Sequence, residues 1–95
     1  MEAQQKFDKS KWIKNNGNDY PYRDDMLNDL INNVKLKEIK YDSLISLLGP
    51  ANREDGQYLF YRIMQHRLGF FVLSEKTLVV KLNEDSTVAW RKIKE

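Results

Sequence analysis

The chain of 95 residues contains no cysteine and a single histidine, His66. Without cysteine, disulfide bonds, thiolate metal sites, catalytic thiols and a lipid-bearing cysteine are excluded within this sequence. Zinc prefers nitrogen and sulfur ligands, so one histidine disfavours a transition-metal site. We therefore expect neither a metal nor a cofactor. The lack of cysteine says nothing about the redox compartment, because cysteine-free domains occur on both sides of membranes.

Glycine is scarce and scattered. The four glycines, at positions 17, 49, 56 and 69, form neither a P-loop nor a Gly-x-Gly-x-x-Gly motif, so no phosphate cradle is predicted. A catalytic serine would need His66 as a base within hydrogen-bond reach. Ser74 is close to it in sequence, but Leu73-Ser74-Glu75 lacks the Gly-x-Ser-x-Gly turn. The sequence therefore predicts a protein that is not an enzyme, with His66 as a surface residue at a strand end.

Long hydrophobic runs are also absent. The longest, Gly69 to Leu73, has five residues, whereas a membrane-spanning helix needs about 20. The N-terminus has no apolar stretch of the signal-peptide type. Two histories fit these facts: either the chain is cytoplasmic, or an export segment preceded it and was removed. We expect membrane association only through such a removed anchor.

What is present indicates one small globular domain. Apolar residues make up 41% and charged residues 32% of the 11.3 kDa chain, which is a globular rather than a disordered composition. A chain of this mass buries roughly 65% of its surface on folding, enough for one modest core. Sixteen basic against fourteen acidic residues leave a net charge of +2, so the overall balance implies no polyanion-binding face.

Residues 1–21 are predicted to form a polar N-terminal arm, and residues 22–95 a single domain. The arm is made basic by Lys6, Lys9, Lys11 and Lys14. Three apolar side chains, Phe7, Trp12 and Ile13, are candidate anchors, and we expect a partly ordered arm that they hold to the body. The alternative is a basic and aromatic strip that touches an anionic membrane or a nucleic acid.

Two segments after Pro21 have helical periodicity. Asp24 and Asp25 can complement the positive end of the first helix. Its apolar stripe consists of Met26, Leu27, Leu30, Ile31 and Val34. The second helix is predicted to begin with Asp42 as its N-cap and to end at Gly49-Pro50. Its buried stripe consists of Leu44, Leu47 and Leu48.

The hydrophobic period changes to two after Gly56. Three strands are predicted, over Gln57–Gln65, Thr77–Leu82 and Thr87–Ile93. Asn83–Ser86 is a hairpin connection, and Val88 and Trp90 are predicted to share a face. Phe70–Leu73 is either a short extra strand or an apolar loop over one end of the sheet. This order predicts an α+β fold, in which two N-terminal helices pack on one face of a three- to four-stranded antiparallel sheet.

One face of that sheet should stay open, because two short helices can cover only the other. The aromatic residues on or beside the sheet are Tyr58, Phe60, Tyr61, Phe70, Phe71 and Trp90. Some of them should remain accessible, and exposed Tyr and Trp are enriched in protein-binding hot spots. The alternative is that they complete a core short of aliphatic residues. Arg67–Val72 departs from the RNA-binding strand motif, because Leu68 and Phe70 occupy its small-residue positions, so a nucleic-acid partner is disfavoured.

Three segments together resemble a known family. A helix ending in Leu47-Leu48-Gly49-Pro50 is followed by Gly56-Gln57-Tyr58-Leu59-Phe60-Tyr61, and then by the strand, turn and strand of residues 78–88. This order is similar to the SmpA/OmlA small-lipoprotein family, which shares its fold with the β-lactamase inhibitor protein. The resemblance covers roughly residues 25–93. It implies a bacterial protein, secreted or lipid-anchored in the cell envelope rather than cytoplasmic, that binds other proteins. No functional residue of the family maps onto this chain.

Together these observations predict a non-catalytic protein-interaction module. The predicted partner-binding residues are Tyr58, Phe60, Tyr61, Arg62, Trp90 and Arg91. Their aromatic side chains would be buried against an unknown protein partner, with the two arginines as rim charges. The alternative is a small-anion or nucleic-acid binder that uses the arm lysines with Arg62, Arg67 and Arg91. A monomer or a weak dimer is expected, since a sheet with an unpaired edge can associate.

Overall fold

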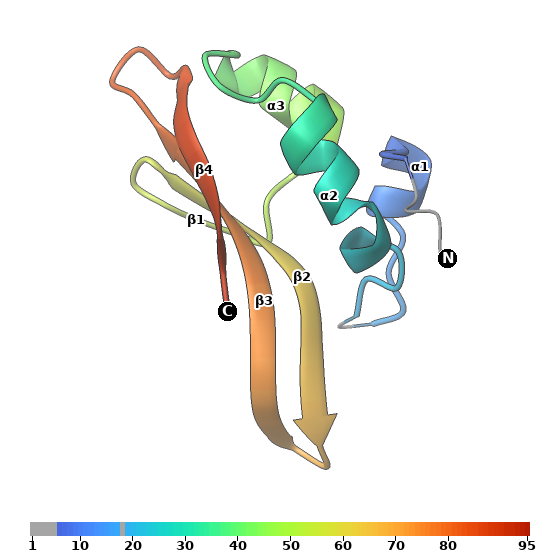
Figure 1. The fold of residues 1–95 in the computed structure, drawn as a ribbon. Coiled ribbons are helices and arrows are strands. Elements are labelled where there is room, and N and C mark those ends of the chain that lie inside the picture. The colour runs from blue at the N-terminus through green and yellow to red at the C-terminus, as the bar shows by residue number, and fades with distance from the viewer. Residues whose placement is uncertain (1–5, 18) are drawn as a thin grey trace.

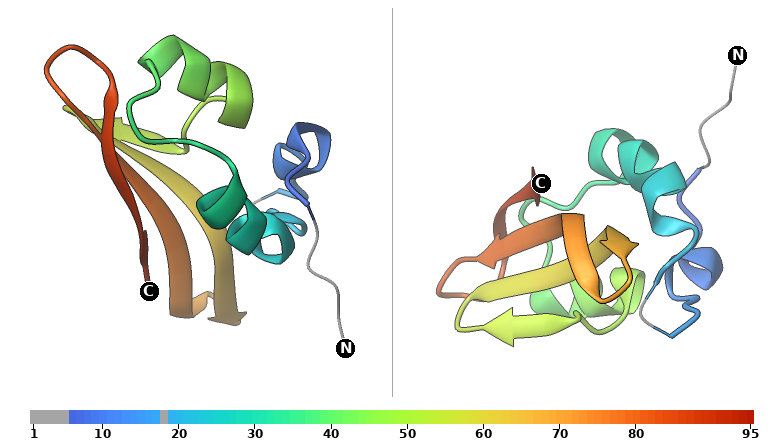
Figure 2. Two further views of the ribbon diagram at one scale, coloured as in Figure 1. Left: turned by 45° about the horizontal axis from the view of Figure 1, so that its top comes forward. Right: turned by 90° about the horizontal axis from the view of Figure 1, so that it is seen from below.

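The computed structural model describes residues 6–17 and 19–95, which form a helical layer on one side of an antiparallel sheet (Figures 1 and 2). The helices are α1 (Lys9–Trp12), α2 (Arg23–Asn33) and α3 (Tyr41–Leu48). The strands are β1 (Arg53–Asp55), β2 (Tyr58–Leu68), β3 (Phe71–Leu82) and β4 (Val88–Lys94). The predicted α+β class with an antiparallel sheet is confirmed.

The sheet is a meander in which the strand order β1-β2-β3-β4 follows the chain, and every pairing is antiparallel. β2 and β3 are much longer than their neighbours, and β4 pairs with β3 only from Thr77 onward. Residues 64–76 therefore continue past the rest of the sheet as a two-stranded ribbon (Figure 1). Phe71–Leu73 extends β3 along this ribbon and is not a loop folded over the sheet end.

The core lies between the sheet and the helices. Alternate residues of β2, Leu59, Tyr61 and Ile63, face the helical layer and are fully buried. The rest of the core cluster consists of Trp12, Met26, Leu27, Leu30, Leu36, Leu44, Leu48, Leu78, Val80, Leu82 and Val88. The Tyr61 hydroxyl donates a 2.9 Å hydrogen bond to the carbonyl of Gly49.

Helix α2 begins at Arg23, just before the two aspartates expected at its start, and α3 begins at Tyr41, two residues earlier than predicted. Asp24 and Asp25 occupy the first turn of α2, where their negative charge stabilises the positive end of the helix dipole. No side chain caps this helix with a hydrogen bond. The prediction that Asp42 is the N-cap of α3 is wrong: Lys40 stands at that position, and Asp42 lies in the first turn. The predicted end of α3 is confirmed, since Gly49 adopts φ +79° there.

The described part of the arm is packed against the body. Trp12 is fully buried in the core, although it lies in α1, a helix that the sequence did not predict. The backbone N–H of Phe7 donates to the carboxylate of Asp29 at 2.7 Å, and its ring packs on the core. Of the three expected anchors, Ile13 remains 46% exposed. Residues 1–5 and 18 of the predicted arm lie outside the described residues.

A buried arginine joins the arm, α2 and the sheet. Arg23 is only 3% exposed. Its guanidinium donates to the carbonyls of Trp12 and Arg62, both at 2.8 Å, and to the side-chain oxygen of Asn52 at 3.1 Å. The ring of Tyr20 covers it, with its centroid 3.6 Å from Cζ. Burial lowers the pKa of Arg23 to about 10, which still leaves the side chain charged at neutral pH.

A β-bulge in β4 overturns one predicted register. Lys81 pairs with Trp90 and Leu82 pairs with Val88, so Ala89 is an extra residue that has no partner on β3. The prediction that Val88 and Trp90 share a face is therefore wrong. The bulge turns Val88 into the core and Trp90 to the other side of the sheet.

Candidate functional site

The sheet face opposite the helices, here called the open face, is covered by no other element among the described residues. Strand alternation and the pairing register place these residues on it: Arg53, Asp55, Tyr58, Phe60, Arg62, Thr77, Val79, Lys81, Trp90, Lys92 and Lys94. Val79 lies at its centre and is buried, yet it is not part of the main core cluster. Phe60 and Lys92, its neighbours on the adjacent strands, flank it. The open face thus has a small apolar centre within a polar surface.

An aromatic cluster occupies one end of the open face. Tyr58 and Phe60 are stacked with ring centroids 6.4 Å apart, and Trp90 meets Tyr58 edge-on at 6.2 Å. Lys81 lies between Tyr58 and Trp90 in the register, with its Nζ 5.7 Å from the Tyr58 centroid. Tyr58 and Trp90 are 38% and 40% exposed, so a binding partner could bury much more of both rings.

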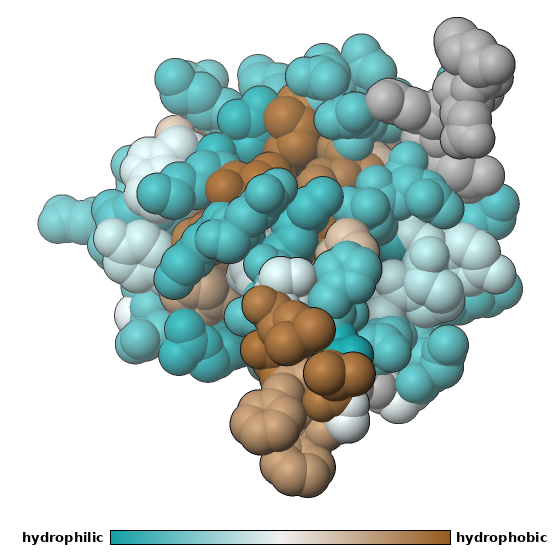
Figure 3. Space-filling model, turned by 60° about the horizontal axis from the view of Figure 1, so that its bottom comes forward, coloured by the Kyte–Doolittle hydropathy of each residue, from teal (hydrophilic) through white to brown (hydrophobic). Residues whose placement is uncertain are grey.

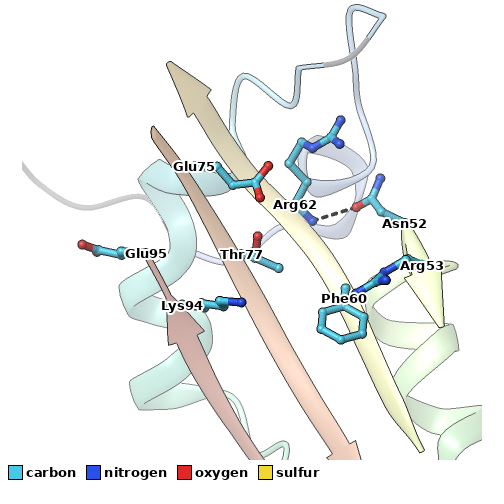
Figure 4. A pocket seen from close by; sticks show the side chains of 8 residues that line it. All are labelled: Asn52, Arg53, Phe60, Arg62, Glu75, Thr77, Lys94 and Glu95. Carbon is cyan, nitrogen blue, oxygen red and sulfur yellow. Dashed lines mark hydrogen bonds between the residues drawn. The ribbon is translucent and has the colours of Figure 1, made fainter. Parts of the chain in front are cut away.

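Beside the cluster the open face is hollowed. The hollow has a volume of about 550 Å³ and is lined by Asn52, Arg53, Phe60, Arg62, Glu75, Thr77, Lys94 and Glu95 (Figure 4). The guanidinium carbon of Arg53 lies 4.2 Å from the Phe60 ring centroid. The backbone N–H of Arg62 donates to the Asn52 side chain at 2.8 Å, which fixes the strand beside the hollow. Both signs of charge line this hollow, so it is not a dedicated anion site.

The open face carries an excess of basic side chains. Basic residues outnumber acidic ones on the open face, which carries Arg53, Arg62, Lys81, Lys92 and Lys94. Helix α2 on the other side carries three aspartates and one arginine, Arg23, which is buried. The open face is therefore locally basic in a chain whose net charge is only +2.

The structure divides the predicted partner-binding residues between the two faces of the sheet. Tyr58, Phe60, Arg62 and Trp90 meet on the open face. The expectation that Tyr61 is accessible is wrong: it points into the core, and burial raises its pKa. Arg91 also lies on the helical side, where its guanidinium donates to the carbonyl of Ile31 at 3.0 Å. Residues on a strand alternate between faces, so Tyr61 and Arg91 cannot join the aromatic cluster.

The residues considered for catalysis lie on the ribbon. His66 and Ser74 are cross-strand partners, and both are exposed. The neighbouring carboxylate of Glu75 accepts a hydrogen bond from the amide of Gln65 at 2.7 Å. Among the described residues, no group of three or more His, Cys, Asp or Glu side chains could hold a metal ion. In the same part of the chain, no helix is long and apolar enough to cross a membrane.

The far end of the ribbon carries a surface that the sequence did not identify as a site. Leu68, Phe70, Phe71, Val72 and Leu73, here called the apolar tip, form a knob that projects from a largely hydrophilic surface (Figure 3). Phe70 is 86% exposed and the other four are between 49% and 67% exposed. The sequence signal was available, because residues 68–73 contain no charge and Gly69 permits a tight turn.

Comparisons with protein-family models, with curated proteins and with solved structures find no match to this chain.

Proposed function

We propose that this chain is a non-catalytic protein-interaction module that uses its open face to bind an acidic surface on a partner protein. The observation that carries the proposal is the aromatic cluster of Tyr58, Phe60 and Trp90, which is partly exposed and is flanked by Lys81 and Arg53. Tyr and Trp give large contact area at low entropic cost, and they dominate the binding energy of many interfaces.

The charges around the cluster indicate what kind of surface the partner presents. Lys81 flanks the cluster, while Arg53 and Arg62 lie beside the hollow. Charges at the rim of an interface mainly steer association and select partners, whereas the desolvated aromatic centre provides affinity. An acidic partner surface with an apolar centre is the complement of this arrangement.

The alternative of an anion or nucleic-acid binder requires its arginines to converge. Arg62 lies on the open face, Arg91 on the helical side and Arg67 on the ribbon, so the constellation expected from the sequence is dispersed. Because the open face is basic and aromatic, nucleic acid is the competing ligand for it. The dependence of binding on salt distinguishes nucleic acid from a protein partner. A polyanion loses affinity steeply as salt rises, whereas an aromatic interface does not.

We also propose that the fold is the β-lactamase-inhibitor-protein-like arrangement and that the chain is related to the SmpA/OmlA small lipoproteins of the bacterial envelope. Two features support this: α2 and α3 precede an antiparallel meander, and they lie on one face of it. Such a relationship fits the proposed binding role, although a fold alone does not determine function.

The test is a capture experiment followed by a titration. The chain is used as bait in a lysate of its source organism at low and high salt, and the captured protein is then purified and titrated against variants. Tyr58→Ala and Trp90→Ala should each weaken binding at least about tenfold. The matched control is Tyr22→Ala, since Tyr22 is 37% exposed but lies at the start of α2. Equal affinity of all three variants, or capture of nucleic acid that high salt removes, would overturn the proposal.

A further inference from the structure

The apolar tip contributes nothing to the packing of the domain. None of its residues belongs to the core cluster or packs against it. Phe70 and Phe71 contact each other, with ring centroids 5.0 Å apart. A two-stranded ribbon without a covered face is only marginally stable in water. The exposed apolar side chains therefore mark a surface that another phase or molecule covers.

The end of the ribbon is closed in a way that suits an apolar environment. Leu68 pairs with Phe71, so only Gly69 and Phe70 form the turn. Gly69 has φ +61° and Phe70 is not left-handed, as in a type II′ turn. The turn is therefore as short as a hairpin allows, so it adds few unpaired backbone groups to those on the outer edges of the two strands, and this limits the free-energy cost of removing the tip from water.

Apolar side chains leave both faces of the ribbon. The cross-strand partners Leu68 and Phe71 share one face, whereas Val72 shares the opposite face with its partner Arg67. A protein docked against one face would leave the other in water. A medium that surrounds the tip covers both, and the convex shape of the knob fits such a medium (Figure 3).

A second copy of the chain does not provide a matching surface. An aromatic side chain presents roughly 150–250 Å² when free. Phe70 and Phe71 are 86% and 63% exposed, so the two rings, flanked by three smaller aliphatic side chains, offer only about 220–370 Å². A stable protein interface buries about 800 Å² on each partner. The hollow on the open face is lined mainly by polar and charged side chains, with Phe60 as its one aromatic residue, so it is a poor complement to the apolar tip.

The charged residues nearest the tip limit how deeply it can enter an apolar medium such as a lipid bilayer. Arg67 flanks it on β2, and Glu75 is the first charged residue after it on β3. Two to three residues separate Arg67 from the end of the turn, which corresponds to about 7–10 Å at the rise of a strand. This length matches the roughly 5–10 Å to which interfacial protein segments enter the boundary between headgroups and acyl chains.

We propose that the apolar tip inserts into the interfacial layer of a lipid bilayer, with the guanidinium of Arg67 at the level of the lipid phosphates. The site is separate from the open face, so the chain could hold a protein partner at a membrane surface. The attachment is mainly hydrophobic, because His66 and Arg67 are the only basic residues near the tip within residues 64–75. Neutral lipid should therefore suffice for binding.

The first test is flotation with vesicles of phosphatidylcholine alone and with added phosphatidylglycerol, at low and high salt. The wild-type chain should float with both and remain bound at high salt. The double variant F70S/F71S should partition about thirtyfold less, the factor expected when two rings each transfer about half their area. The control Y58A/W90A, which alters the open face, should float like the wild type. Far-UV circular dichroism of all variants establishes that they fold.

The second test locates the tip directly. Because the chain has no cysteine, V72C carries a single environment-sensitive fluorophore, and S46C on the exposed side of α3 is the matched control. With vesicles, the label at position 72 should shift to the blue and be quenched by lipids spin-labelled near the headgroup, while the label at position 46 stays unchanged. Absence of flotation, binding only to anionic vesicles that high salt reverses, or equal behaviour of both labels would overturn the proposal.

Discussion

The Tyr61 hydroxyl makes one buried hydrogen bond. Replacing Tyr61 by phenylalanine tests whether this side chain is buried in the core and not exposed on the open face. In the folded chain the hydroxyl donates to the Gly49 carbonyl just after α3. Tyr61→Phe keeps the ring and its packing against Trp12, whose centroid is 6.3 Å away. The substitution removes only the hydroxyl and leaves a buried carbonyl without that donor.

The expected loss at neutral pH is about 1–2 kcal/mol, the lower part of the range for a buried carbonyl that loses its partner. Burial also raises the pKa of Tyr61 above its ordinary value of 10.0. Above pH 10 the unfolded chain has lost a proton that the folded chain retains, so wild-type stability falls by about 1.4 kcal/mol per pH unit on this account. Phenylalanine does not titrate. The stability difference between the two proteins should therefore shrink above pH 10 and vanish near about pH 11.

Urea denaturation of both proteins, followed by far-UV circular dichroism at several pH values, measures this difference. Other titrating groups, Arg23 among them, are present in both proteins and largely cancel in the comparison. A deficit that stays constant from neutral pH to pH 11 would refute the reasoning. It would mean that Tyr61 ionises as readily in the folded chain as in the unfolded one, as an exposed tyrosine does.

Three further substitutions test other parts of the fold by thermal denaturation. Trp12→Ala should cost about 3–5 kcal/mol, because this ring is fully buried; a loss below about 1 kcal/mol would show that the arm is not part of the core. Gly49→Ala should cost about 1–3 kcal/mol, since Gly49 has φ +79° and a Cβ there would lie 3.2 Å from Ile13; an unchanged midpoint would contradict that backbone conformation. Lys76→Ala should cost less than about 1 kcal/mol, because its 2.8 Å ion pair with Asp24 is partly exposed; a larger loss would indicate an additional role for Lys76.

The parts of the fold with a strong hydrophobic period could be predicted from the sequence. Helices α2 and α3 carry apolar stripes, and the three long strands are rich in β-branched and aromatic residues. Strand β1 has no such hydrophobic period, because all three of its residues are exposed, whichever side of the strand they lie on. Its pairing with β2 depends on the turn at Gly56, and not on burial.

The candidate site could be predicted only in part. Alternation along β2 already places Tyr58 and Phe60 on the opposite face from Tyr61, so the burial of Tyr61 could have been predicted from the sequence. The position of Trp90 was not, because the bulge at Ala89 breaks the alternation on which such a prediction depends. The exposure of Phe70 and Phe71 follows from the length of β2 and β3 relative to their neighbours, which is a tertiary property.

The ribbon also affects how the chain behaves when nothing covers its end. From residue 64 to residue 76 neither strand pairs with a third strand in the part of the chain that the structure describes, so both edges present free backbone groups to solvent. Residues 68–73 combine high β-propensity with no charge and no proline, which is the composition of segments that form amyloid-like fibrils. Arg67 and the pair Glu75-Lys76 then act as gatekeepers that oppose stacking of one chain on another. The colloidal stability of this protein at high concentration therefore depends on three charged residues at the margin of an apolar hairpin.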